Sequence, residues 1–326
     1  MGNTAKAIHL IRPFSIMAEA AVSGFLQAPG NPKVDFTAPE GAPALYAPDS
    51  MAWRIFKNPV TVYMGGIAAV ILELAEPRVR AGVWNHSRFR TDPLSRLRRT
   101  GLAAMTTVYA EAETAKRMIA RVNAMHRAVS GTTECGASYR ADDPILLDWV
   151  QATASFGFAS AYSAYAEPLF DTDWDRLLRE GQTPAQLYGA MGTPRSAIEM
   201  QAFFRRMDPF LEGSEVIFAF LGIMRQAPAF PLALRPLQPA LIKSAIALLP
   251  ENLRARLGLG ARFLPNASER FLVKAVARTA NRIVIANHPA VEASMRMGLP
   301  PDWLFGEGPF YKPNATQRPV RVSGPA

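Results

Sequence analysis

The chain has 326 residues, of which 49% are hydrophobic and 19% charged, a balance typical of a folded protein with a sizeable core. Part of its net charge of +9 lies between Arg78 and Arg99, where seven arginines occur with a single acid, Asp92. No series of interleaved aromatic residues or recognised nucleic-acid module accompanies them, so we expect no nucleic-acid partner. The one cysteine, Cys135, excludes an intramolecular disulfide framework and a multi-cysteine zinc site.

The first 48 residues contain many prolines and glycines and are expected to form an irregular arm with one short helix near its start. The N-terminus lacks the pattern of a signal peptide. The longest apolar runs, VTVYMGGIAAVIL and VIFAFLGIM, are shorter than the roughly 20 residues that a membrane-spanning helix needs. We therefore expect no transmembrane segment and a cytoplasmic location, which leaves peripheral contact with a membrane open. Residues 307–326 are expected to be a loose tail.

Residues 49–306 are expected to form a single helical domain. Three pairs of a capping residue and a proline predict helix starts, at Asn58-Pro59, Asp92-Pro93 and Asp143-Pro144. After the first pair, apolar residues recur at helical spacing up to Glu76-Pro77: Val60, Met64, Ile67, Ile71 and Leu74. Further helical windows follow at about 171–189, 196–212, 214–226, 237–257 and 267–286. Because strand-like alternation is nowhere sustained, the sequence predicts an all-α fold.

Another helix is expected over 111–129, and it carries the most informative residue. Ile119, Val122, His126 and Val129 share one face of this helix, which Ser130-Gly131 should end. The chain has four histidines, and it lacks Glu-x-x-His, His-Glu-x-x-His, Walker A and Gly-x-Ser-x-Gly motifs. Haem is the metal centre that such a chain can hold most economically, since one protein ligand suffices. A lone histidine on an apolar helix face is, however, more often a hydrogen-bonded core residue.

From about Asn58 to Ala166 the chain resembles the haem oxygenase family typified by the fungal oxygenase MpaB and the rubber-cleaving latex clearing protein. The resemblance rests on YMGGIAAVILELAEP, GVWNHSRFRTDPLSRLRRT, ARVNAMHRAVSG and YRADDPILLDWVQA, in family order and spacing. It implies an all-helical fold with a globin-like core, a b-type haem, and oxidative attack on hydrophobic alkenes.

The same resemblance implies roles for single residues. His126 matches the proximal iron ligand of the latex-clearing branch, and Arg96 and Thr100 match its distal arginine and threonine. Arg99 takes the place of a lysine that can close the sixth coordination site of the iron. Because a guanidinium offers no lone pair to a metal, the sixth site is expected to be open or water-bound here. In DWVQA, Gln151 stands where many relatives have histidine.

Other residues leave alternatives open. His86 is expected to be a distal acid or second ligand, or else a capping residue. Arg98, with Arg88 and Arg90, could bind the haem propionates or form an exposed basic face. Glu73 and Glu76 could supply a pocket carboxylate that acts as a base, or make salt bridges at a helix end. From these we select Glu76 as the candidate base, beside Arg96 and Thr100.

The sequence therefore predicts a haem b-dependent oxygenase that uses O2 on a hydrophobic, isoprenoid-like alkene. Four residues are assigned to the haem: His126, His86, Arg98 and Arg99. The alternative is a non-catalytic protein of the same fold that binds haem or a hydrophobic ligand. A helical interaction protein without a cofactor is the third hypothesis.

Overall fold

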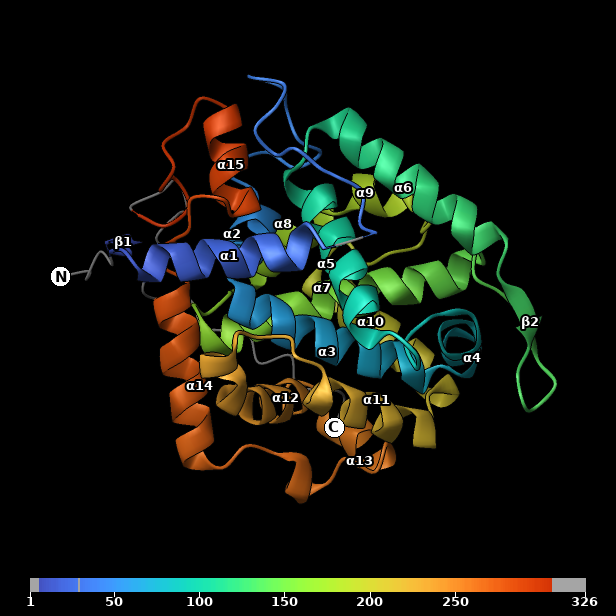
Figure 1. The fold of residues 1–326 in the computed structure, drawn as a ribbon. Helices are drawn as coiled ribbons and strands as arrows, with labels where there is room; N and C mark the ends of the chain where they lie inside the picture. The colour runs from blue at the N-terminus through green and yellow to red at the C-terminus, as the bar shows by residue number, and fades with distance from the viewer. Residues whose placement is uncertain (1–5, 29, 307–326) are drawn as a thin grey trace.

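The computed structural model describes residues 6–28 and 30–306. Almost all of its regular structure is helical, and Figure 1 shows the helices packed against one another around a common core. Within these ranges the strands form two short pairs. Strand β1 (Ile8–His9) is parallel to β4 (Ile283–Val284), and β2 (Ser130–Thr132) is antiparallel to β3 (Ser138–Arg140). The predicted all-α class is confirmed, while the globin-like arrangement of the core stays a prediction.

The α-helices are, in chain order, α1 (Phe14–Leu26), α2 (Met51–Phe56), α3 (Pro59–Ala75), α4 (Pro77–His86), α5 (Pro93–Tyr109), α6 (Ala112–Arg127), α7 (Pro144–Tyr165), α8 (Asp171–Glu180), α9 (Gln182–Leu187), α10 (Ala197–Met207), α11 (Glu215–Gln226), α12 (Gln238–Ile246), α13 (Glu251–Arg256), α14 (Ala267–Ala280) and α15 (Pro289–Arg296). Three short 3₁₀ helices lie between them: η1 (Asp208–Phe210), η2 (Leu232–Leu237) and η3 (Ala261–Phe263).

All three helix starts predicted from capping residues are confirmed. The Asn58 side chain accepts hydrogen bonds from the backbone N–H groups of Val60 and Thr61 at the start of α3. Asp92 and Asp143 cap α5 and α7 in the same way. Each cap satisfies an N–H group that has no partner within its own helix, and the following proline has no N–H to satisfy.

Two of the long helical windows are broken in the structure. The window 171–189 divides into α8 and α9, because Pro184 has no N–H to donate to the Glu180 carbonyl and its ring would clash there. The window 237–257 divides into α12 and α13, because Pro250 disfavours a helical conformation at Leu249. The window 267–286 ends earlier than expected, at Ala280, since the chain continues into β4.

The centre of the molecule is the crossing of α3 and α7, the two helices that lie behind α5 in Figure 1. A Cβ on Gly65 would lie 2.7 Å from the Cα of Phe158 and 2.8 Å from the Gly157 carbonyl oxygen. The two helix backbones therefore touch at this point. Trp149 of α7 donates its indole N–H to the Leu72 carbonyl of α3, 3.2 Å away, which holds the same two helices together about two turns further on.

The N-terminal segment packs onto this body. The C-terminal end of α1 meets α5 (Figure 1), and the Phe25 ring covers Gly101. The buried Arg296 of α15 donates hydrogen bonds to the carbonyls of Phe36, Ala42 and Tyr109 at 2.8 to 3.0 Å. One guanidinium thus joins the segment after α1 to α5 and α15. The division into an arm of residues 1–48 and a domain of 49–306 stays a prediction, and the expected tail at 307–326 lies outside the described residues.

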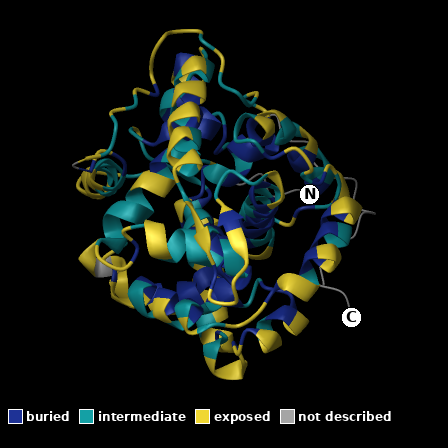
Figure 2. Cartoon of the chain, turned by 90° about the vertical axis from the view of Figure 1, so that its right-hand side faces the viewer, coloured by how far each residue is buried: buried dark blue, intermediate teal, exposed yellow. Residues whose placement is uncertain are grey.

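Figure 2 views the molecule from the side of the β2–β3 hairpin, whose residues are mostly exposed, with the buried positions behind it. Across residues 6–28 and 30–306, no single helix has the length and hydropathy of a membrane span. Helices α3 and α4 reach those values only as a pair, and they are bent by 111° where they join.

Candidate active site

Helices α5 and α6 run back against each other and bring His126 and Arg96 together. On α6 the apolar stripe faces inward: Ala115 and Ile119 are buried, and Val122 and His126 are partly buried. The Nδ1 atom of His126 is itself buried and has no hydrogen-bond partner. The expectation that α6 turns His126 toward the interior is confirmed.

The His126 imidazole is held neutral near neutral pH. Burial lowers its pKa, the nearby charge of Arg96 lowers the pKa further, and Asp142 opposes both effects. A neutral imidazole has a lone pair on one ring nitrogen, which can bind a metal or accept a hydrogen bond. In His126 no hydrogen-bond partner occupies the Nδ1 atom, so this nitrogen is available for such an interaction.

Arg96 is tied to its own helix by Thr100. Its Nη1 donates to Thr100 Oγ1 at 2.8 Å, and Thr100 Oγ1 donates to the Arg96 carbonyl at 2.9 Å. The Nε atom of Arg96 is buried without an acceptor. Burial lowers the pKa of Arg96, Glu73 raises it, and Arg99 lowers it. The two residues that the sequence paired, Arg96 and Thr100, are therefore in contact, and Arg96 keeps one donor free.

Glu73, near the end of α3, is the carboxylate beside Arg96. Burial raises its pKa to about 7, and the charge of Arg96 counteracts that rise. No hydrogen bond contributes to this pKa, so the charge of Arg96 is the one interaction that favours the ionised form. A carboxyl group that titrates near pH 7 can both accept and return a proton under physiological conditions.

Glu76 has a different role in the structure. It is buried and caps α4, with one carboxylate oxygen accepting from the Val79 N–H at 2.8 Å. The other oxygen accepts from Arg78 Nε at 2.6 Å. Both oxygens of Glu76 are thus engaged at a helix start, which matches the helix-end alternative of the sequence analysis. Glu73, one turn earlier on α3, is the carboxylate that we place in the site.

The remaining candidates lie around the edge of this site or apart from it. Arg98 is partly buried, and its Nε has no acceptor. Arg99 is exposed on α5 and acts on Arg96 through its charge. His86 ends α4 and is exposed. Its Nε2 lies 3.1 Å from the Tyr139 hydroxyl on β3, so the structure joins His86 to the hairpin.

The other two histidines are not part of the site. His288 is buried and caps α15, where its Nδ1 accepts from the Ala290 N–H at 3.2 Å. Burial lowers the pKa of His288 to about 4. His9 lies exposed on β1. Neither contacts Arg96 or Glu73 through any interaction in the described ranges.

The donor set suits a metal group that needs a single protein ligand. Among the described residues, no three His, Cys, Asp or Glu side chains gather closely enough to hold a metal ion by themselves. His126 is a single neutral imidazole with a buried, unpartnered nitrogen, and Arg98 adds a buried, unpaired donor for an anionic periphery. This set fits a haem, whose iron takes one imidazole and whose propionates take arginines.

We expect Glu73→Gln to remove part of the pH dependence of stability. The folded pKa of Glu73, about 7, lies above the ordinary value of 4.5, so its contribution is complete below about pH 4.5 and is lost as the pH rises to 7. That loss amounts to about 3 kcal/mol at most. Urea unfolding of both proteins at pH 4.5 and pH 8 measures it.

In this experiment the wild-type protein should lose more stability between the two pH values than the Glu73→Gln variant. Glu292, whose pKa burial also raises to about 7, is present in both proteins and cancels from the difference. If the free energy of unfolding fell equally in the two proteins, the pKa of Glu73 would not be raised by burial.

Most of the chain matches a known protein family. A model described as the ER-bound oxygenase mpaB/B'/rubber oxygenase catalytic domain matches residues 53–282, well over half of the chain. No curated protein and no solved structure matches. The matched region begins in α2 and ends just after α14, so it includes Glu73, Arg96, Thr100 and His126. The chain therefore belongs to the mpaB and rubber oxygenase family, a family of oxygenases.

Proposed function

We propose that this protein is a haem b-dependent oxygenase that uses O2 to attack a carbon–carbon double bond in a hydrophobic, isoprenoid-like substrate. One observation carries the proposal. Arg96 on α5, whose buried Nε has no acceptor, is near both the neutral His126 on α6 and Glu73 on α3, which has a pKa of about 7. The membership in an oxygenase family supports it.

In this proposal His126 holds the iron, and Arg98 and Arg99 bind the propionates. When bound, haem supplies the oxygen chemistry, for which no side chain of the protein is suited. His126 fits the ligand role because its pKa is lowered, which keeps a nitrogen lone pair available at neutral pH.

Arg96 and Glu73 act on the substrate side. Arg96 has a buried Nε–H without an acceptor, and this donor can stabilise negative charge that develops on oxygen. Thr100 orients the guanidinium through its 2.8 Å hydrogen bond. Glu73 accepts a proton from the substrate, because its pKa of about 7 leaves an ionised fraction at neutral pH.

The experiment is an absorbance spectrum of the freshly purified protein followed by O2 uptake with an isoprenoid alkene. We expect a Soret band and alkene-dependent O2 consumption. Arg96→Gln should keep the Soret band and lower kcat about 100-fold, the cost of removing a preorganised donor. Arg121→Gln, at an exposed position of α6, is the matched control and should leave kcat unchanged.

The outcomes separate the three hypotheses of the sequence analysis. A protein without a Soret band, which also fails to take up added haem, contradicts the cofactor. A Soret band without O2 uptake on any alkene favours the non-catalytic ligand-binding alternative. Equal kcat in the Arg96→Gln and Arg121→Gln variants would remove Arg96 from the catalytic group.

A further inference from the structure

The outer face of α14 combines basic and large apolar side chains. Phe271, Lys274 and Arg278 follow each other at intervals of three and four residues, so they share one face of the helix, and all three are exposed. The opposite face, with Val273 and Ala277, is buried in the core. Phe271 is 78% exposed. Helix α14 therefore presents a phenyl ring beside two cations to the outside of the molecule.

The end of α14 is joined to the start of α1. Strand β4, which follows α14, pairs with β1, and the Arg282 Nε donates to the Lys6 carbonyl at 2.9 Å. Figure 1 shows α1 beginning beside the end of α14. After β1 the chain exposes four more large apolar residues: Ile11, Phe14, Ile16 and Met17. The apolar residues of α14 and those at the start of α1 are thus connected through the β1–β4 pair.

The charges of these two segments have one sign. Residues 6–17 and 270–288 contain no acid and six lysines and arginines: Lys6, Arg12, Arg270, Lys274, Arg278 and Arg282. Five of them are exposed, and Arg282 is partly buried. Within the described residues none of the six pairs with a carboxylate, and Glu269, the one acid of α14, is paired with Lys243 at 2.8 Å. These cations are therefore available to an anion outside the protein.

A bilayer with anionic headgroups matches this combination of side chains. Each Lys or Arg beside such a surface raises the binding constant about fivefold. An apolar side chain that enters the headgroup region gains further affinity, because its area is removed from water.

Two other partners match less well. A second copy of the chain, related by a two-fold axis, would bring the same cations face to face, and they would repel each other. A nucleic acid would use the cations but would leave Ile11 and Met17 in water. The membrane is the partner that uses both kinds of side chain.

We propose that α14 and the adjoining start of α1 form a docking surface for a membrane that contains anionic lipids. Phe271 and Phe14 enter the headgroup region, and the six cations lie beside the lipid phosphates. Docking needs neither haem nor turnover, so this proposal stands apart from the proposed function. It would bring the protein to the phase in which a hydrophobic alkene dissolves.

The test is co-sedimentation of the purified full chain with lipid vesicles. One set consists of phosphatidylcholine, and the other of equal parts of phosphatidylcholine and phosphatidylglycerol. We expect about a hundredfold tighter binding to the anionic vesicles. Raising the salt concentration from about 0.1 M to about 1 M should remove most of that preference, because the screening length falls from about 10 Å to about 3 Å.

Charge variants locate the cationic part of the surface. The double variant Lys274→Gln, Arg278→Gln should bind anionic vesicles about thirtyfold more weakly, the product of two fivefold effects. The double variant Arg121→Gln, Arg205→Gln removes the same charge at exposed positions of α6 and α10 and should keep the wild-type affinity. The circular dichroism spectra of both should match that of the wild type, since all four side chains are exposed.

Apolar variants locate the inserted part. Phe271→Ser and Phe14→Ser should each weaken binding to anionic vesicles about tenfold, the effect of partly burying one phenyl ring. Ile198→Ser, at a position of α10 that is 76% exposed, is the matched control and should have no effect. A surface that bound through charge alone would give full affinity in all three variants.

Four results would overturn the proposal. These are no binding to either kind of vesicle, equal binding to both, equal affinity in the surface and control variants, and binding of a DNA duplex in place of vesicles. The outcome is separate from the oxygenase test. Vesicle binding without a Soret band would reject the haem proposal alone, and a Soret band without vesicle binding would reject the docking surface alone.

Discussion

Under the proposed haem-dependent function, the His126→Ala variant is expected to lose essentially all of the Soret absorbance. His126 is the one histidine that α6 turns toward Arg96, and its buried Nδ1 has no competing partner. Removing a single axial ligand removes the main bond between iron and protein. Spectra of equal concentrations of both proteins, purified with added haem, measure the effect.

This experiment has an internal control and a rescue. His9→Ala changes an exposed histidine on β1 and should keep the full Soret band. Imidazole added to the His126→Ala variant should restore part of the band, because it can occupy the space of the missing side chain. A native Soret band in His126→Ala would show that another group is the ligand, and the His86→Ala variant would then be measured next.

The Gly65→Ala variant is expected to lower the free energy of unfolding by about 3 kcal/mol. A Cβ at this position would lie 2.7 Å from the Phe158 Cα and 2.8 Å from the Gly157 oxygen, and both are backbone atoms that cannot rotate away. Helices α3 and α7 would have to separate along their crossing. Urea unfolding followed by circular dichroism measures the change.

The adjacent Gly66 offers a matched control. A Cβ on Gly66 would meet only the Phe158 ring, at an ordinary contact distance of 3.9 Å. Alanine has the higher helix propensity, so Gly66→Ala should raise stability by about 0.5 to 1 kcal/mol. Stability changes of opposite sign at these two neighbouring glycines would identify the close contact between α3 and α7 at Gly65 as the cause. Equal shifts would show that the two helices do not touch at Gly65.

Much of the helical framework can be predicted from local sequence. Asn58, Asp92 and Asp143 each precede a proline, and each caps the helix that follows. These signals act over three or four residues, so they need no knowledge of the rest of the chain. The breaks at Pro184 and Pro250 are local too, although the apolar periodicity on either side of them concealed the interruptions.

The site was predictable only in part. The stripe on α6 placed His126 inward, because one helix face follows from residue spacing alone. The contact of Arg96 with Thr100 also lies within one helix, at four-residue spacing. The choice between Glu73 and Glu76 could not be made this way, since both lie near the end of α3. It depended on which carboxylate caps α4 and which lies against α5.

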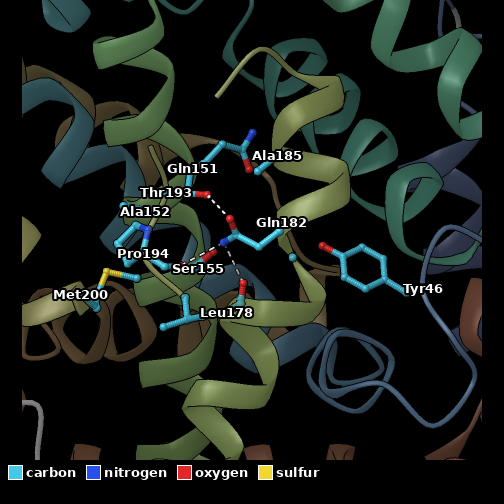
Figure 3. Close-up of a pocket in the computed structure, with 11 residues that line it drawn as sticks. Tyr46, Gln151, Ala152, Ser155, Leu178, Gln182, Ala185, Thr193, Pro194 and Met200 are labelled. Carbon is cyan, nitrogen blue, oxygen red and sulfur yellow. Dashed lines mark hydrogen bonds between the residues drawn. The ribbon is translucent and has the colours of Figure 1, made fainter. Parts of the chain in front are cut away.

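The all-α class, the capped starts of α3, α5 and α7, and the inward face of α6 follow from local sequence, because capping and periodicity are short-range effects. That Arg96 lies near both Glu73 and His126 depends on how α3, α5 and α6 pack. Only the tertiary structure placed Gln151 in a polar pocket with Tyr46 (Figure 3), more than a hundred residues earlier. Such groupings follow from how helices pack, and packing depends on the joint shape of surfaces that are far apart in the chain.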